Sequence, residues 1–114
     1  MLIAHVLREK GATVHTLQAD ATLEQAAREL FARRVGALVV LDGAGAILGV
    51  FSERDLVREV AKRGATALGD SVGAAMSRDV SVARPDENID EGLARMTDRR
   101  VRHLPVLEDT RLVG

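Results

Sequence analysis

Cysteine, tryptophan and tyrosine are absent from this chain of 114 residues, and phenylalanine occurs only as Phe31 and Phe51. Without cysteine the chain cannot form a disulfide framework, use a thiolate nucleophile or bind zinc through sulfur ligands. With only two aromatic rings it lacks the stacking platforms used to bind single-stranded nucleic acid. The core must therefore be built mainly from Ala, Val and Leu side chains.

An excess of one charge is also missing, because 16 Lys and Arg residues are balanced by 17 Asp and Glu residues. Nucleic-acid binding usually needs a basic face, so this balance argues against a nucleic-acid partner. No apolar run reaches the roughly 18 residues of a membrane span, and the charged N-terminus is unlike a secretory signal. We therefore expect a soluble, cytoplasmic protein with no membrane partner.

The chain repeats itself at an interval of 66 residues. Residues 20–41 align with residues 86–107, and Leu48 and Gly49 align with Val113 and Gly114 after a one-residue gap. The identical pairs are Asp20/Asp86, Arg33/Arg99, Arg34/Arg100, Val35/Val101, Leu38/Leu104, Val40/Val106 and Leu41/Leu107. We interpret this as a tandem duplication, with a first repeat at 1–65 and a connecting helix and second repeat at 66–114.

Both halves follow the same order of predicted elements, although the second stops early. The predicted elements are short β runs at 14–17 and 80–82, buried strands at 37–41 and 103–107, a hairpin strand at 46–51, a helix at 53–62 and a short helix ending near Met76. Nothing in the second half corresponds to residues 50–62, so we expect a truncated second repeat.

A further helix in each half is predicted from its start signal and its apolar stripe. Thr22 with Gln25, and Asn88 with Glu91, are capping-box pairs three residues apart. In the first half the apolar positions 23, 26, 27, 30 and 31 follow helical spacing, which predicts one buried face that includes Phe31.

Three segments resemble the signatures of one family. Residues 49–56 (GVFSERDL) resemble its Gly–apolar–apolar–Ser/Thr–x–x–Asp segment, residues 100–106 (RVRHLPV) resemble its RxRHLPV strand, and Met76 with Ser77 resembles the Met-Ser/Thr before each β run. The chain is thus similar to tandem CBS-domain pairs (Bateman modules), most of all to small stand-alone bacterial members. This resemblance implies an α+β fold of two β-α-β-β-α repeats with pseudo-two-fold symmetry, in which small sheets pack against helices.

The same resemblance implies a regulatory module that binds an adenine nucleotide (AMP, ATP or NAD(H)) in a cleft between the repeats. It further implies a homodimer, an unidentified regulated protein as partner, and no catalytic cofactor. In the family the ribose contacts the signature Asp, here Asp55, and phosphates approach the signature Ser/Thr, here Ser52. The implied nucleotide-binding residues are Thr16, Gly36, Ala37, Ser52, Arg54, Asp55, Arg102, His103 and Pro105.

The chemistry of these residues agrees with that assignment. Ser52 precedes a helix, so its hydroxyl and the free N–H groups of residues 53–55 would make an anion site. A carboxylate at Asp55 would repel a phosphate but would accept hydrogen bonds from both hydroxyls of a ribose. Arg102 is a good phosphate neighbour because its charge does not depend on pH.

Other interpretations of the same residues stay open. Ser52 and Asp55 also form a capping box that would cap the helix with no ligand, and the chain could then be a ligand-free dimerisation and interaction module. An enzyme is disfavoured because the sequence contains no paired acid–base constellation, and His5, His15 and His103 lack metal-ligand spacing. The second half has no Ser/Thr-x-x-Asp segment, so only the site at Asp55 is predicted with a ribose acceptor.

Overall fold

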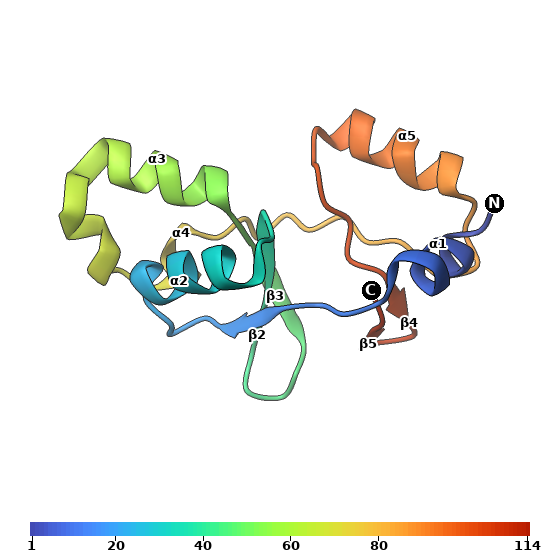
Figure 1. Ribbon diagram of the computed structural model, residues 1–114, viewed down its shortest axis with the longest axis horizontal. Coiled ribbons are helices and arrows are strands. Elements are labelled where there is room, and N and C mark those ends of the chain that lie inside the picture. Colours follow the sequence, from blue (N-terminus) through green and yellow to red (C-terminus); the bar gives the residue numbers. More distant parts are fainter. The chain divides into compact units, whose positions relative to one another are not determined.

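The computed structural model describes residues 1–114 and combines helices with small sheets (Figure 1). Its elements are α1 (Ile3–Lys10), β1 (Thr16–Gln18), α2 (Leu23–Arg33), β2 (Ala37–Leu41), β3 (Ile47–Ser52), α3 (Glu53–Arg63), the 3-10 helix η1 (Gly64–Gly69), α4 (Val72–Ala75), α5 (Ile89–Arg99), β4 (Leu107–Glu108) and β5 (Arg111–Leu112). The predicted α+β class is therefore confirmed.

Two compact units make up the chain, and their boundaries differ from those of the repeats. Unit 1 combines Met1–Val14 with Val80–Gly114, and unit 2 is His15–Asp79. α1 lies in the range of the first repeat but packs with the second repeat, in unit 1. α4 lies in the range of the second repeat but packs with the first repeat, in unit 2. The boundaries 1–65 and 66–114 describe the duplication in the sequence and stay a prediction.

Unit 2 contains a three-stranded sheet in the order β1-β2-β3. β1 runs parallel to β2, with Leu17 opposite Val40, and β3 runs antiparallel to β2. The hairpin between β2 and β3 is held by Asp42, whose Oδ1 accepts from the N–H groups of Ala44 at 2.8 Å and Ala46 at 2.9 Å. Gly45, with φ of 87°, provides the left-handed residue of this turn. The predicted hairpin is confirmed.

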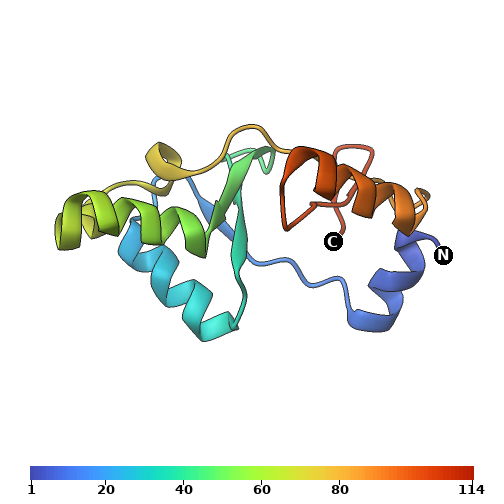
Figure 2. The ribbon, with the colours of Figure 1, turned by 90° about the horizontal axis from the view of Figure 1, so that it is seen from above.

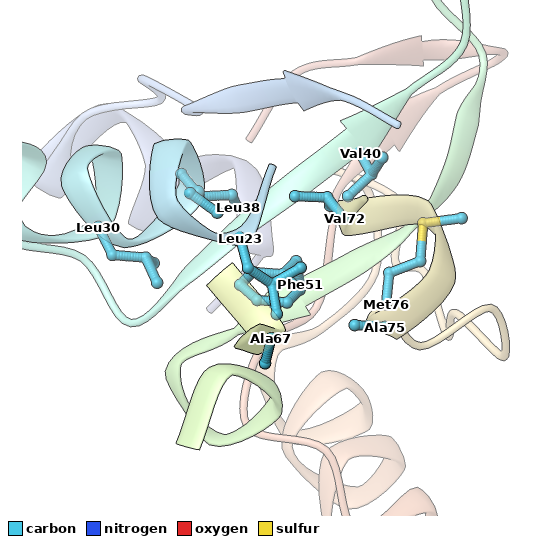
Figure 3. Close-up of a cluster of buried hydrophobic side chains, with 10 residues drawn as sticks. Leu23, Leu30, Leu38, Val40, Phe51, Ala67, Val72, Ala75 and Met76 are labelled. Carbon is cyan, nitrogen blue, oxygen red and sulfur yellow. The ribbon is translucent and has the colours of Figure 1, made fainter. Parts of the chain in front are cut away.

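The core of unit 2 lies between the sheet and the helices (Figure 3). The buried cluster consists of Leu23, Ala26, Leu30, Leu38, Val40, Phe51, Ala67, Val72, Ala75 and Met76. The predicted stripe on α2 is confirmed at Leu23, Ala26 and Leu30 but is wrong at Phe31, which is 87% exposed. Phe31 follows Leu30 by one residue, or about 100° of helical rotation, which turns its ring away from the sheet.

The backbone bonds that lead into the long helix are the same in both units. Leu2 forms a bridge with Asn88 as Ser71 does with Thr22. In unit 1 the flanking bonds are Ile3 N–H to Glu87 O at 2.9 Å and Ala4 N–H to Pro85 O at 2.9 Å; in unit 2 they are Val72 N–H to Ala21 O at 2.7 Å and Gly73 N–H to Ala19 O at 2.9 Å. The duplication seen in the sequence is therefore also a duplication of structure.

The strands of unit 1 are shorter than predicted. Residues 80–82 form no strand, and of 103–107 only Leu107 lies in one. Val106 still keeps its place, forming a parallel bridge with Ala83 and exchanging bonds of 2.8 Å with Val113 and Gly114. Pro105 has no N–H to donate, which interrupts the ladder at this point.

The helix starts also differ between the two units. The capping box of Thr22 and Gln25 is confirmed, with bonds of 3.1 and 2.8 Å. Asn88 caps α5 differently, because its side chain accepts from Asp90 N–H at 2.9 Å. The predicted reciprocal box with Glu91 is wrong, because the Asn88 side chain accepts from the second helical N–H and not from the third.

Candidate functional site

Ser52 and Asp55 join the end of β3 to the start of α3. Ser52 N–H donates to Asp55 Oδ2 at 2.8 Å, and the Ser52 hydroxyl donates to the same oxygen at 3.0 Å. Asp55 N–H lies 3.3 Å from Ser52 Oγ, which completes a capping box at the helix start. The predicted helix at 53–62 is confirmed, extends to Arg63 and is followed by Gly64 at φ of 64°.

Arg58 holds the other oxygen of Asp55. Its Nη1 donates to Asp55 Oδ1 at 2.9 Å, and its Nη2 donates to the carbonyl of Ala75 in α4 at 3.0 Å. Hydrogen bonds to Glu59 and Asp55 raise the pKa of Arg58 above its ordinary value. Arg58 was not among the predicted site residues, although its position one helical turn after Asp55 is the spacing at which side chains meet.

Asp55 is therefore a buried carboxylate that is already engaged. The residue is 8% exposed, and it is the only charged or polar residue buried to this degree in the chain. Its two oxygens have about four lone-pair sites and accept three hydrogen bonds, so about one remains, on Oδ1.

Small residues and strand ends surround this carboxylate. Ala37 pairs with Ser52 in the antiparallel ladder, and Glu53 N–H donates to the carbonyl of Gly36 at 3.0 Å. Thr16 begins β1 and pairs with Val39, two residues after Ala37. The first residues of β1 and β2 and the start of α3 thus share one edge of unit 2.

The expected anion site at residues 53–55 is largely used by the protein itself. The N–H groups of Glu53 and Asp55 are bonded to Gly36 and to Ser52, as described above. The reason is that the strand-to-helix turn and the capping box satisfy these donors internally. Arg54 remains exposed and takes part in no ion pair of the structure.

Six of the nine predicted site residues lie together in unit 2. These are Thr16, Gly36, Ala37, Ser52, Arg54 and Asp55. The other three belong to unit 1, where Arg102 and His103 are exposed and Pro105 is buried. The assignment of all nine to a nucleotide stays a prediction.

Two further observations concern other classes of site. The chain holds no group of three or more His, Asp or Glu side chains that could bind a metal ion. Nor does any helix combine the length and the apolar character that a membrane crossing requires.

Two units that each contain a capped helix followed by an antiparallel hairpin define a tandem α+β module, with a capped acidic turn in its first repeat. The chain belongs to the CBS domain family, which it matches over residues 11–62 and 72–114. CBS-domain proteins are generally regulatory rather than catalytic. The recognition made from residues 49–56 and 100–106 is therefore confirmed.

Relatives of known structure share the fold throughout. A CBS-domain containing protein from Agrobacterium tumefaciens is 41% identical with a TM-score of 0.94, over 99% of this chain and 84% of that one. A CBS-domain pair solved with 5′-methylthioadenosine and S-adenosyl-L-methionine is 23% identical with a TM-score of 0.88, over 100% of this chain and 86% of that one. A mitochondrial CBS domain-containing protein of Arabidopsis thaliana is 28% identical over 98% of this chain, which spans 58% of that relative.

Proposed function

We propose that this chain is a non-catalytic regulatory module that binds an adenine nucleotide, AMP, ATP or NAD(H), with the ribose at Asp55. The observation that carries the proposal is a buried carboxylate at a helix start, beside two small residues, Gly36 just before β2 and Ala37 at its start. The adenosine-containing ligands of a related CBS-domain pair support this class of ligand.

The hydrogen bonds at Asp55 suggest how a ribose would be received. One ribose hydroxyl would donate to the remaining lone pair of Oδ1. The second would donate to Oδ2 in place of the Ser52 hydroxyl, which now lies 3.0 Å from that oxygen. The Ser52 hydroxyl would then be free to turn toward the phosphate, and exposed Arg54 would supply a positive charge nearby.

The remaining residues would contribute by shape and by charge. Gly36 has no side chain and Ala37 only a methyl group, so an adenine ring could approach the backbone closely there. The proposal also includes four nucleotide-binding residues that the family resemblance implies, Thr16, Arg102, His103 and Pro105.

A thermal-shift panel tests this function. A ligand that binds only the folded chain raises its melting temperature, by an amount set by its concentration relative to Kd. We expect AMP, ATP or NADH at millimolar concentration to stabilise the chain more than the matched guanine or cytosine nucleotide does. Equal melting temperatures with and without every adenine nucleotide would contradict the proposal.

The second candidate function, a ligand-free interaction module that forms a homodimer, is favoured by one apolar surface of unit 2. α2 and α3 lie side by side there (Figure 1 and Figure 2). Phe31 is 87% exposed and Val57 66% exposed on these two helices. Next to Phe31 is a hollow lined by Ala27, Leu30, Val35 and Leu56, with Arg34 and Glu53 also in its wall.

We infer that this surface would pair with the same surface of a second copy. A two-fold pairing would place Phe31 of one copy in the hollow of the other, and Arg34 of one copy opposite Glu53 of its partner. Light scattering should find dimers of the chain and a larger monomer fraction for Phe31→Ser. Val82→Ser, at an apolar residue that is 36% exposed in unit 1, is the matched control. A monomer at all accessible concentrations would rule out this module.

A further inference from the structure

Arg58 bonds to three partners through its guanidinium group. Its Nη1 donates to Oδ1 of Asp55 at 2.9 Å, its Nη2 to the carbonyl of Ala75 at 3.0 Å, and its Nε to Oε2 of Glu59 at 3.1 Å. All three nitrogens are thus engaged, with partners on both α3 and α4. A planar group held at three points has little freedom to turn, so Arg58 presents to Asp55 a donor of fixed direction.

This donor fixes the orientation of the Asp55 carboxylate. The N–H and the hydroxyl of Ser52 both donate to Oδ2, whereas Arg58 donates to Oδ1. The torsion that turns an aspartate carboxylate about its Cβ–Cγ bond is soft and has a broad range of allowed values. Without Arg58 the carboxylate would stay bonded through Oδ2 but would be free to carry Oδ1 away from its present position.

α2 begins with a capping box and an arginine at the same spacing as α3. In chain order the two sets are Thr22, Gln25 and Arg28 on α2, and Ser52, Asp55 and Arg58 on α3. Arg28 pairs with Glu24 of its own helix at 3.0 Å, and its side chain is 79% exposed. The side chain of Arg58 is only 45% exposed and reaches α4. The bridge at Asp55 therefore does not follow from the spacing alone but needs the carbonyl at the end of α4.

We propose that Arg58 is a positioning residue that aims Oδ1 of Asp55 at one hydroxyl of a bound ribose. This inference rests on the proposed function, because it concerns the same carboxylate. By fixing Oδ1, Arg58 makes the site selective for nucleotides that carry this hydroxyl. The other hydroxyl is received at Oδ2, which Ser52 holds independently of Arg58. The bond to Ala75 makes α4 the support of this selectivity.

Nucleotides that differ by one ribose hydroxyl test this role. Calorimetric titration would measure the Kd of ATP, 2′-deoxy-ATP and 3′-deoxy-ATP, and of the three corresponding monophosphates, for the unchanged chain and for Arg58→Met. Because a hydrogen bond to a carboxylate is lost, each deoxynucleotide should bind the unchanged chain at least ~10-fold more weakly than its ribonucleotide. In Arg58→Met one of these two ratios should fall to about 2-fold or less, and the other should keep its value.

Arg28→Met is the matched control, because it removes an arginine at the same spacing from α2, which carries no proposed ligand residue. Both ratios should keep their values in this control. Arg58→Lys decides the question if Arg58→Met does not fold. It retains the charge, but a single ammonium group cannot span Asp55 and Ala75 as the planar guanidinium does, so the same one ratio should fall.

Two unchanged ratios in the Arg58 variants, or an equal loss of both ratios, would overturn the proposal. It would also be overturned if the unchanged chain bound ATP and AMP no better than their deoxy forms, or did not bind them. The thermal-shift panel, which includes NADH, decides separately on the proposed function.

Discussion

Because β3 lies in close contact with the segment after α4, we predict that a side chain at Gly49 destabilises the fold. A Cβ at this position would lie 2.8 Å from Sδ of Met76 and even closer to the carbonyl oxygen of Ser77. The same segment pairs with β3, because Val50 and Ser77 exchange backbone hydrogen bonds of 3.0 and 2.9 Å. Gly49→Ala must therefore push a hydrogen-bonded backbone away from the strand.

The magnitude follows from two opposing effects. Alanine in a strand regains about 0.5–1 kcal/mol of backbone entropy relative to glycine. Overpacking against a backbone that cannot move freely costs about 1–3 kcal/mol. We expect a net loss of about 1–2 kcal/mol, or a melting temperature lower by roughly 4–8 °C per kcal/mol.

Urea unfolding monitored by circular dichroism measures this change. Gly43→Ala is the matched control, because an added Cβ there would meet nothing within 4 Å and its φ is not positive. The control should keep or slightly raise the free energy of unfolding. If Gly49→Ala were as stable as the unchanged chain, the packing of Met76 and Ser77 against β3 would be wrong.

Three further predictions concern single charged residues. The hydrogen bond from Arg95 at 2.7 Å lowers the pKa of Glu87. The stability that this ion pair contributes is therefore present above the unfolded pKa near 4.5 and is lost as the pH falls through the lower folded value. Glu87→Gln should reduce the loss of unfolding free energy at acid pH in a series of denaturation measurements. Arg34 follows α2 in the left-handed conformation, with φ of 55°, which glycine adopts at lower cost than arginine. Arg34→Gly should therefore raise the urea midpoint by the equivalent of about 0.5–1 kcal/mol. An unchanged or lower midpoint would contradict the expected backbone strain at Arg34. Arg58→Met should loosen α3 from α4, visible as faster amide hydrogen exchange in both helices, and unchanged exchange would show that the bond to Ala75 contributes nothing.

Much of the fold follows from local patterns in the sequence. The hairpin after β2 could be predicted because Asp42 and the glycines that follow are typical turn residues, and α2 because its cap and apolar spacing agree. The duplication predicted the shared plan of the two units. The family could be recognised because residues 49–56 and 100–106 carry specific segments in the right order.

The features that the sequence did not predict have physical reasons that no local pattern contains. Phe31 has helical spacing, but its exposure depends on which tertiary elements cover α2. The exchange of α1 and α4 between the two repeats depends on long-range backbone pairing, of Leu2 with Asn88 and of Ser71 with Thr22. At the candidate site the sequence indicated Ser52 and Asp55 but not Arg58, whose hydrogen bond to the carbonyl of Ala75 joins α3 to α4.

The affinity of an adenine nucleotide for an Asp55 variant tests the central proposal most directly. Calorimetric titration would compare the unchanged chain with Asp55→Ala and with Thr22→Ala, which removes the other confirmed capping box from a helix that carries no proposed ligand residue. Losing hydrogen bonds to a charged group costs about 1.5–3 kcal/mol, so we expect Asp55→Ala to raise Kd by roughly 10- to 100-fold while Thr22→Ala leaves it unchanged. Equal Kd values for the unchanged chain and Asp55→Ala would contradict the ribose site.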